Sequence, residues 1–259
     1  MIVCKSPGEI EKMRAANALV AQVLAELAAM VVPGVSTRDL DVAAERMVRE
    51  GGAEPAFKGY RGYPATLCAS VNEQVVHGIP SDRPLAEGDI LSLDMGVKLN
   101  GFYGDSAVTV PVGRIAEEAA ALLRVTEEAL ERGIRQVRVG GRISDIGHAV
   151  QEHVERHGYS VVREFVGHGI GVALHEEPQI ANYGEPGRGP RMVEGMVFAI
   201  EPMVNMGRPA VKVLGDGWTA VTRDGSLSAH FEHTVAVTKD GPDVLTVRTS
   251  SPVGTTRAS

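Results

Sequence analysis

The chain has 259 residues, 44% of them hydrophobic and 23% charged, and a net charge of -7 at pH 7, as expected for a globular protein of one domain. No apolar run reaches the ~18 residues of a membrane helix, the scattered basic residues argue against a DNA-binding surface, and the acids Glu9 and Glu11 interrupt any secretory signal. With only Cys4 and Cys68, we expect a cytoplasmic protein without disulfides, whose metal ligands are nitrogen and oxygen atoms.

Four helices are predicted from capping signals and from apolar residues at helical spacing. The first two each begin at a serine with an acid three positions later, which is the pattern of a capping box. Glycine or proline ends each of them. The predicted helices cover residues 6–33, residues 36–51, roughly residues 116–133, and residues 144–157 with Ser144 as the N-cap.

A strand hairpin is predicted around Asn100 and Gly101, because Asn-Gly between alternating apolar residues is the strongest short hairpin signal. In a two-residue turn, Asp94 faces Ala107 on the other strand. Asp105 is then the diagonal neighbour of Asp94 on the same face of the hairpin. The carboxylates of these two residues are therefore expected to meet.

The order of predicted elements repeats along the chain. Residues 53–70 are irregular, and short strands broken by glycine and proline follow the fourth helix. Two helices followed by a strand hairpin occur at residues 7–110 and again at residues 116–237. This order predicts an α+β fold with two pseudo-duplicated halves. We expect residues 1–248 to form a single catalytic domain and the small, polar residues 249–259 to form a disordered tail.

Two further acids lie in strand-like surroundings in the second half. Glu201 ends an apolar strand, and Glu232 lies inside an alternating strand on the face that also carries His230 and Thr234. The alternatives are a salt bridge for each glutamate and a solvated outer face for the hairpin acids. Four converging carboxylates carry a charge of about -4, which two divalent cations neutralise, so the pattern favours a two-metal site.

The segment GHGIGVALHEEPQI offers this site a nitrogen ligand, either His168 or His175. Glycines on both sides of His168 allow the backbone to turn tightly near a crowded centre. A bend must separate the two histidines if both serve one site, because their odd spacing places them on opposite faces of a strand. The segment lacks the GxGxxG spacing of a dinucleotide site.

Two other candidates are interpreted as structural. His153 and His157 are four residues apart on the fourth helix and could bind zinc, but they lack the HExxH order and lie among Glu and Arg. We therefore expect them on a solvated helix surface. Cys68 is expected to be a small wall residue and not a nucleophile, since no histidine lies near it in the sequence.

Taken together, the motifs resemble those of the type I methionine aminopeptidases. The resemblance covers about residues 5–240, and its main segments are KSPGEIEKMR, GYRGYPATLCASVNEQVVHGIP, GDILSLDMGV, GFYGDSAVT, GHGIGVALHEEPQI, EGMVFAIEPM and GWTAVTRDGSLSAHFEHTV. It implies the pita-bread fold, in which two pseudo-two-fold halves form a curved antiparallel sheet flanked by helices. The segment between Glu201 and Glu232 is too short for the helical insertion of type II enzymes.

The resemblance also implies an activity, namely removal of the initiator methionine from nascent proteins whose second residue is small. Two divalent ions, cobalt, manganese, iron or zinc, would activate a water, and the free α-amine of the substrate would bind one of them. The implied metal ligands are Asp94, Asp105, His168, Glu201 and Glu232, with Asp105 and Glu232 bridging.

Other residues receive roles from the resemblance alone. Glu201 would pass a proton to the leaving amine, and His77 and His175 would line the substrate site, where His175 would stabilise the oxyanion. Asn72 and Ser228 match backbone positions that hold a monovalent cation in some members. The methionine pocket would be lined by Tyr60, Tyr63, Cys68 and Trp218, with Phe57 and Leu174 where many members have Cys and Phe.

Two rival functions share this fold. An Xaa-Pro aminopeptidase or prolidase has the same five ligands, but usually carries a further N-terminal domain for which this chain has no room. A non-catalytic pita-bread binding protein typically loses ligands, whereas all five are present. We expect a monomer that acts on nascent chains, with a transient ribosome contact and with neither DNA nor membrane as a partner.

Overall fold

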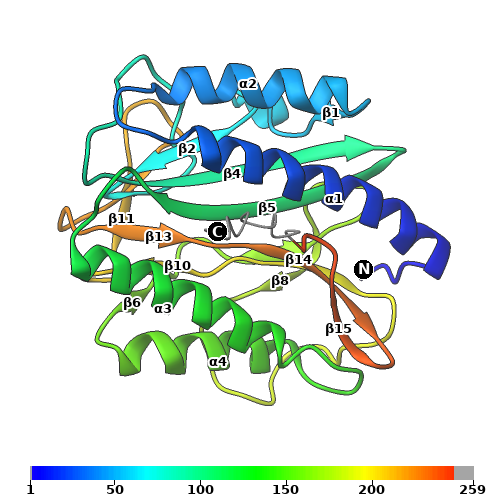
Figure 1. The fold of residues 1–259 in the computed structure, drawn as a ribbon. Coiled ribbons are helices and arrows are strands. Elements are labelled where there is room, and N and C mark those ends of the chain that lie inside the picture. Colours follow the sequence, from blue (N-terminus) through cyan, green and yellow to red (C-terminus); the bar gives the residue numbers. More distant parts are fainter. Residues whose placement is uncertain (1, 248–259) are drawn as a thin grey trace, which may run out of the picture.

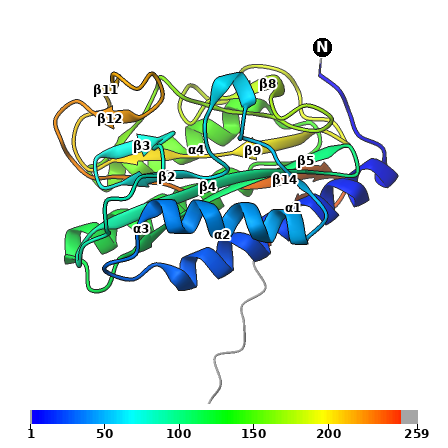
Figure 2. The ribbon, with the colours of Figure 1, turned by 90° about the horizontal axis from the view of Figure 1, so that it is seen from above.

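The computed structural model describes residues 2–247 of the chain, so the predicted tail lies outside the described residues. Its strands lie between two pairs of helices, with α1 and α2 on one side and α3 and α4 on the other (Figure 1). Seen from above, α1 and α2 run side by side along β4 and β5 (Figure 2). The helices are α1 (Pro7–Met30), α2 (Thr37–Glu50), α3 (Glu117–Ile134) and α4 (Ile143–Arg156).

The first two helices begin where their capping boxes predict. The Ser6 N–H donates to Glu9 Oε2 at 2.7 Å, and the Glu9 N–H donates back to Ser6 Oγ at 3.4 Å. Ser36 and Asp39 exchange the same pair of bonds at 3.1 and 3.2 Å. Two of the backbone donors that a helix start leaves unpaired are satisfied in each case.

The prediction that Ser144 caps α4 is wrong. The N-cap is Arg142, whose N–H donates to Asp145 Oδ2 at 2.8 Å. The Ser144 hydroxyl instead donates to the Arg188 carbonyl at 3.0 Å and accepts from the Arg188 N–H at 2.7 Å. This serine lies inside the helix, where it fastens a loop that is distant in sequence.

All strand pairings between named strands are antiparallel within the described residues. The strands form four hydrogen-bonded sheets, in the orders β1-β4-β2 with β5 on β4, β13-β10-β6, β11-β12-β3, and β15-β14-β9-β7-β8. Their bounds are β1 (Glu54–Pro55), β2 (Cys68–Val71), β3 (Gln74–Val76), β4 (Ile90–Leu99), β5 (Phe102–Pro111), β6 (Ser160–Val161), β7 (Gly167–Gly169), β8 (Glu176–Ile180), β9 (Val197–Ile200), β10 (Met203–Asn205), β11 (Val211–Val213), β12 (Ala220–Thr222), β13 (Ser228–His230), β14 (His233–Thr238) and β15 (Gly241–Val244). A short 3-10 helix, Tyr60–Gly62, lies in the segment predicted to be irregular.

The predicted hairpin register is confirmed in β4 and β5. Asn100 and Gly101 both have positive φ, 53° and 83°, as a two-residue hairpin turn of this type requires. Asp94 pairs with Ala107, and Asp105 lies two positions nearer the turn, opposite Gly96. The two acids are therefore diagonal neighbours on one face.

The duplicated α+β order is also confirmed, with one difference in the second half. There, β9 and β14 pair as the predicted strands do, but the chain between them makes β10 to β13 before it returns. Glu232 does not lie inside a continuous strand, because β13 ends at His230 and β14 begins at His233. At this break Glu232 forms a single bridge with Ala107 on β5, which joins the two halves.

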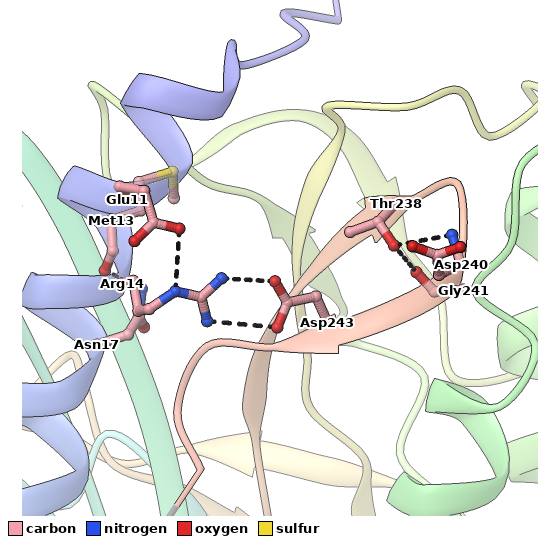
Figure 3. A network of polar contacts seen from close by, with 8 residues as sticks. All are labelled: Glu11, Met13, Arg14, Asn17, Thr238, Asp240, Gly241 and Asp243. Atoms are coloured by element: carbon pink, nitrogen blue, oxygen red, sulfur yellow. Dashed lines mark hydrogen bonds and ion pairs between the residues drawn. The ribbon is translucent and has the colours of Figure 1, made fainter.

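A second connection between the halves lies at the edge of the molecule (Figure 3). Arg14 on α1 donates from both terminal nitrogens to the carboxylate of Asp243 on β15, at 3.3 and 2.6 Å. Its Nε also donates to Glu11 at 3.2 Å. The largest cluster of buried apolar side chains includes Leu24 on α1 and Val150 on α4, so one core spans both halves.

The interpretation of His153 and His157 as solvated surface is wrong for His153. Its side chain is buried between α3 and α4, where Nε2 lies 2.9 Å from Glu128 Oε2. His157, one turn later, is exposed. Within residues 2–247, none of the helices combines the length and the hydropathy of a membrane span.

Candidate metal centre and substrate pocket

A cavity of about 140 Å³ opens between the two halves and holds nearly all the predicted site residues. Its floor consists of Asp94, Asp105, His168, Glu201 and Glu232. Its walls consist of Phe57, Tyr60, Tyr63, Cys68, His77, Leu174, His175 and Trp218. Arg61, which was not predicted, also lines it. Asn72 and Ser228 are absent from the residues that line this cavity.

The floor residues come from five different parts of the chain. Asp94 and Asp105 lie on β4 and β5, and His168 lies on β7. Glu201 directly follows β9, and Glu232 lies at the break between β13 and β14. Because these strands belong to sheets that meet at the centre of the molecule, acids from both halves reach one point.

The floor side chains lie close enough together to bind the same metal ions. His168 Nε2 is 3.8 Å from Asp105 Oδ2 and 3.6 Å from Glu201 Oε1. One ligand atom each from Asp105, His168 and Glu232 lie within 4.8 Å of one another. These donor atoms are carboxylate oxygens and an imidazole nitrogen, which divalent first-row transition metals accept.

The electrostatics of the floor favour a bound cation. Burial is the largest cause of the raised pKa of each of the four carboxyl groups. Neighbouring acids raise the pKa values of Asp105 and Glu232 further. Burial lowers the pKa of His168 to about 3, so its imidazole is neutral and free to act as a ligand. A cation between the carboxylates would remove the repulsion that keeps them protonated.

Unpaired ligand atoms give an independent test of whether the floor fits a metal. Asp105 Oδ1 and Glu232 Oε1 are buried and have no hydrogen-bond partner among the described residues. A buried carboxylate oxygen without a partner is costly, and metal ligation is one of the few ways to satisfy it. The residues present therefore fit divalent metal ions.

The glycines around His168 serve close strand packing, and not the tight turn that the sequence predicted. Strand β7 lies between β8 and β9. A Cβ on Gly167 would lie 2.3 Å from the Ala199 carbonyl oxygen, and one on Gly169 would lie 2.3 Å from the Glu177 carbonyl oxygen. Only glycine lets both neighbours approach on either side of the imidazole.

The predicted bend between the two histidines is present, since His175 lies in the loop before β8. The rings of His168 and His175 are 4.2 Å apart between centroids. His175 Nδ1 lies 3.0 Å from Tyr60 Oη, and the two rings stack. Desolvation is the main cause that lowers the pKa of His175, and nearby Arg61 adds to it. His175 is therefore neutral near pH 7.

His77 lies in the pocket wall in a strained conformation, with φ of 60°. Its ring packs edge-on against Phe165 and Trp218, at 5.4 and 6.2 Å between centroids. Burial lowers the pKa of His77 to about 4, so this imidazole is also neutral. A residue other than glycine in this conformation is uncommon and is typical of functional sites.

The remaining wall is apolar and aromatic. Tyr63 is buried and donates to the Leu67 and Gly78 carbonyls at 3.0 Å each, which fixes its ring edge-on against Trp218. Cys68 is buried beside Tyr63, and burial raises the pKa of its thiol. The thiol is therefore protonated, in keeping with a wall residue.

Asn72 and Ser228 lie together, away from the pocket lining. The Ser228 N–H donates to the Asn72 carbonyl at 2.9 Å, and Asn72 has a positive φ of 56°. The Asn72 side chain donates to Asp89 at 2.8 Å and accepts from the Ile90 N–H at 3.0 Å.

Sequence reasoning gave no role to two residues that the structure brings to the site. His230 is fully buried, with Nε2 3.5 Å from Glu201 Oε2. Its position on the same strand face as Glu232 was the available signal. Arg61 has a positive φ of 49° and places its guanidinium 5.3 Å from the centre of the Tyr60 ring. No pattern in the surrounding loop marked it.

A duplicated α+β fold with four carboxylates, two of them buried, and one histidine at the bottom of a pocket defines a metal-dependent hydrolase of the pita-bread type. Comparison with known proteins agrees. The sequence pattern of metallopeptidase family M24 matches residues 11–239. The methionine aminopeptidase 1 of Bacillus subtilis is 54% identical over 246 residues, which cover 95% of this chain and 99% of that protein. The chain therefore belongs to family M24 and, within it, to the type I methionine aminopeptidases.

Solved structures give the same assignment. The crystal structure of methionine aminopeptidase from Rickettsia prowazekii is similar with a TM-score of 0.94 and 44% identity, covering 95% of this chain and all (100%) of that one. The prolidase from Pyrococcus furiosus is similar with a TM-score of 0.77 and 23% identity, and the match covers 95% of this chain and 65% of that one. The second likeness is one of fold alone.

Proposed function

We propose that residues 1–248 act as one catalytic domain that removes the initiator methionine from nascent proteins with a small second residue. The observation that carries this proposal is the meeting of an acidic floor and an aromatic wall in a single pocket. The floor suits the metal and the α-amine, and the wall suits the apolar methionine side chain. The names of the relatives above agree with this substrate.

The proposed ligands of two divalent ions are Asp94, Asp105, His168, Glu201 and Glu232. When bound, such ions act as Lewis acids that polarise the scissile carbonyl and lower the pKa of water from about 15.7 toward about 7. Cobalt, manganese, iron and zinc all fit this donor set. Bridging by Asp105 and Glu232 is supported by their closeness to His168, with ligand atoms within 4.8 Å.

The protein's own residues then have separate tasks. Glu201 accepts a proton from the attacking water and delivers it to the leaving amine, because its carboxylate lies on the pocket floor beside the other proposed ligands. His175 stabilises the developing oxyanion through Nε2–H, in the tautomer whose Nδ1 accepts a hydrogen bond from the Tyr60 hydroxyl. His77 lines the substrate site, with Trp218 beside its ring.

The methionine side chain would lie among Phe57, Tyr60, Tyr63, Cys68, Leu174 and Trp218. These residues offer apolar and aromatic surface with few polar atoms, so a flexible thioether is accommodated and charged side chains are rejected. The carboxylate floor suits a free α-amine. An N-acetylated chain and an internal peptide bond lack that group, which limits the reaction to one N-terminal residue.

Several finer features belong to the same proposal. We place the reaction in the cytoplasm, where nascent chains appear, with a transient ribosome contact that brings the pocket to its substrate. We propose a monomer, since one chain supplies all the residues that line the pocket. A monovalent cation near the carbonyls of Asn72 and Ser228 is supported by the contact between their backbones, 2.9 Å from N to O.

A comparison of two peptides tests the proposed function. Protein supplied with Mn(II) should release free methionine from Met-Ala-Ser and leave Ala-Pro-Ala intact. Cleavage of Ala-Pro-Ala would instead support an Xaa-Pro aminopeptidase. Metal binding without turnover of either peptide would support a non-catalytic binding protein.

A further inference from the structure

A second cluster of possible metal ligands lies outside the pocket, between α3 and α4. It consists of Glu128 on α3 and of His153 and His157 on α4. One ligand atom from each of the three lies within 4.8 Å of the other two. The two imidazole rings are 4.5 Å apart between centroids and tilted by 59°. The cluster therefore brings two nitrogens and a carboxylate together from two helices.

The hydrogen bonds of His157 leave a nitrogen lone pair available. His157 Nδ1 lies 2.8 Å from the His153 carbonyl oxygen. Because a carbonyl only accepts, Nδ1 carries the proton and Nε2 of the neutral ring holds the lone pair. The imidazole of His157 is thus in the tautomer that a metal ligand needs.

His153 and Glu128 supply the other two donors. His153 Nε2 lies 2.9 Å from Glu128 Oε2, and burial is the main cause that lowers the pKa of His153, which keeps its imidazole neutral near pH 7. Nε2 therefore carries the proton that faces the carboxylate, and a metal ion bound between Nε2 and Oε2 would displace that proton to solvent. In a tetrahedral zinc site, ligand atoms about 2.0 to 2.2 Å from the metal are roughly 3.3 Å from one another. The spacing of the metal-free cluster is wider than this, so metal binding would draw half-buried Glu128 and exposed His157 toward buried His153.

Hydrogen bonds account for the positions of all three side chains: His153 pairs with Glu128, and His157 Nδ1 bonds to the His153 carbonyl at the end of α4. Neither bond uses Nε2 of His157, whose ring lies against that of His153. Histidines at positions i and i+4 of one helix, with a carboxylate nearby, form a common zinc ligand set. Arg132 and Arg124 oppose a cation here, because Arg132 lowers the pKa of His153 and Arg124 lies 4.0 Å from Glu128. The site should therefore be weaker than a structural zinc finger.

We propose that Glu128, His153 and His157 bind one divalent transition-metal ion of the zinc class, which links α3 to α4. This site is separate from the proposed catalytic floor and has no part in the peptidase reaction. It goes beyond the proposed function and does not depend on it.

The test uses a full-length variant in which the catalytic floor is disabled, Asp105→Asn with Glu232→Gln. Zn(II) binding to this metal-stripped protein is measured by calorimetry, and Co(II) binding by its visible absorption. We expect saturable binding that adding His157→Gln weakens by about tenfold or more, since a ligand is lost. His148→Gln, on the same helix but outside the cluster, should leave the affinity unchanged.

Two results would overturn the proposal. One is the absence of saturable Zn(II) binding to the floor-disabled protein, and the other is an affinity that His157→Gln does not change. His157 is exposed, so this variant should fold normally, which equal melting temperatures without metal would verify. Because the readout is metal binding in an inactive background, either result leaves the proposed peptidase function to be judged by the peptide assay.

Discussion

Ser106 and Glu232 join the two halves of the fold beside the metal centre: the Ser106 hydroxyl donates to the Glu232 carbonyl oxygen at 2.6 Å. Thr234 makes the converse contact, donating from Oγ1 to the Asp105 carbonyl oxygen at 2.8 Å. All four residues are buried. The backbones that carry the two acids are therefore held together by side chains one or two positions away from them in sequence, and the separation of the two carboxylates depends on these bonds.

Replacing Ser106 with alanine should harm both stability and turnover. The buried Glu232 carbonyl loses its side-chain donor, which costs about 1 to 3 kcal/mol in the free energy of unfolding. We also expect kcat for Met-Ala-Ser to fall by about tenfold or more, because small displacements of catalytic groups are expensive. Urea denaturation and steady-state kinetics measure the two effects.

The matched control for that experiment is Thr126→Val. Thr126 is also fully buried, and its hydroxyl donates to the Leu122 carbonyl at 2.8 Å within α3, far from the acids in sequence. The Thr126→Val protein should be less stable than the wild type and should keep the wild-type kcat. Equal kcat losses in the two variants would show that the Ser106 effect is general and does not concern the metal centre.

The metal-free protein should lose stability as pH rises from 6.5 to 8.5. Burial raises the pKa of Glu201 to about 8, whereas the unfolded value is about 4, so the folded state binds more protons than the unfolded chain in this interval. Stability is then lost as pH rises through the folded pKa. The histidines that are neutral in the folded state act in the opposite sense, because the unfolded chain still binds protons on them near pH 6.5. Their contribution fades above about pH 7.5, so the loss of stability should be clearest between pH 7.5 and 8.5.

Melting temperatures of metal-stripped protein across this interval measure the effect. Glu201→Gln should flatten the slope, and adding Mn(II) should stabilise the wild type more at pH 8.5 than at pH 6.5. A melting temperature of the metal-free wild type that rises with pH would contradict the assignment of raised carboxyl pKa values.

His175→Ala should lower kcat by about 10² or more while the protein still binds its metals, because the residue lies in the pocket wall and is not among the proposed ligands. Tyr60→Phe removes only the hydroxyl that lies 3.0 Å from His175 Nδ1, so a smaller loss of kcat is expected. Kinetics together with metal content by atomic absorption measure both. Unchanged kcat in His175→Ala would refute the oxyanion role.

The ion pair between Arg14 and Asp243 offers a test of how the edge of the fold is held (Figure 3). The side chains are 39% and 33% exposed, so a double-mutant cycle with Arg14→Ala and Asp243→Ala should give a coupling of about 1 kcal/mol or less. Because two parallel hydrogen bonds join the side chains, we expect a coupling free energy in the upper part of the range for exposed ion pairs. High salt should reduce this coupling. Coupling of several kcal/mol would mean that the pair is desolvated in solution.

Local signals in the sequence were enough to predict the hairpin that brings Asp94 and Asp105 together. A two-residue Asn-Gly turn determines the register of both strands, and the register determines which side chains are diagonal neighbours. The capping boxes of α1 and α2 were predictable for the same reason, since all their bonds lie within four residues.

Features that depend on distant partners could not be predicted. The chain breaks strand pairing at Glu232, where it contacts Ala107 more than a hundred residues away in sequence. Ser144 does not cap α4, because its hydroxyl bonds to the Arg188 backbone. His153 is buried because α3 packs against α4. Helical periodicity shows which face of a helix is polar, but not which neighbouring helix covers that face.

We propose that the acids and His168 hold the divalent metals on which methionyl aminopeptidase activity depends. The most direct test titrates metal-stripped protein with Mn(II) or Co(II) while free methionine is measured from Met-Ala-Ser and from its N-acetylated form. We predict that metal-free protein releases no methionine. With the unblocked peptide only, activity should return on adding metal and level off near two equivalents. Folded Asp105→Asn or Glu232→Gln protein should stay inactive. Full turnover by metal-free protein, or equal cleavage of the acetylated peptide, would contradict the claim.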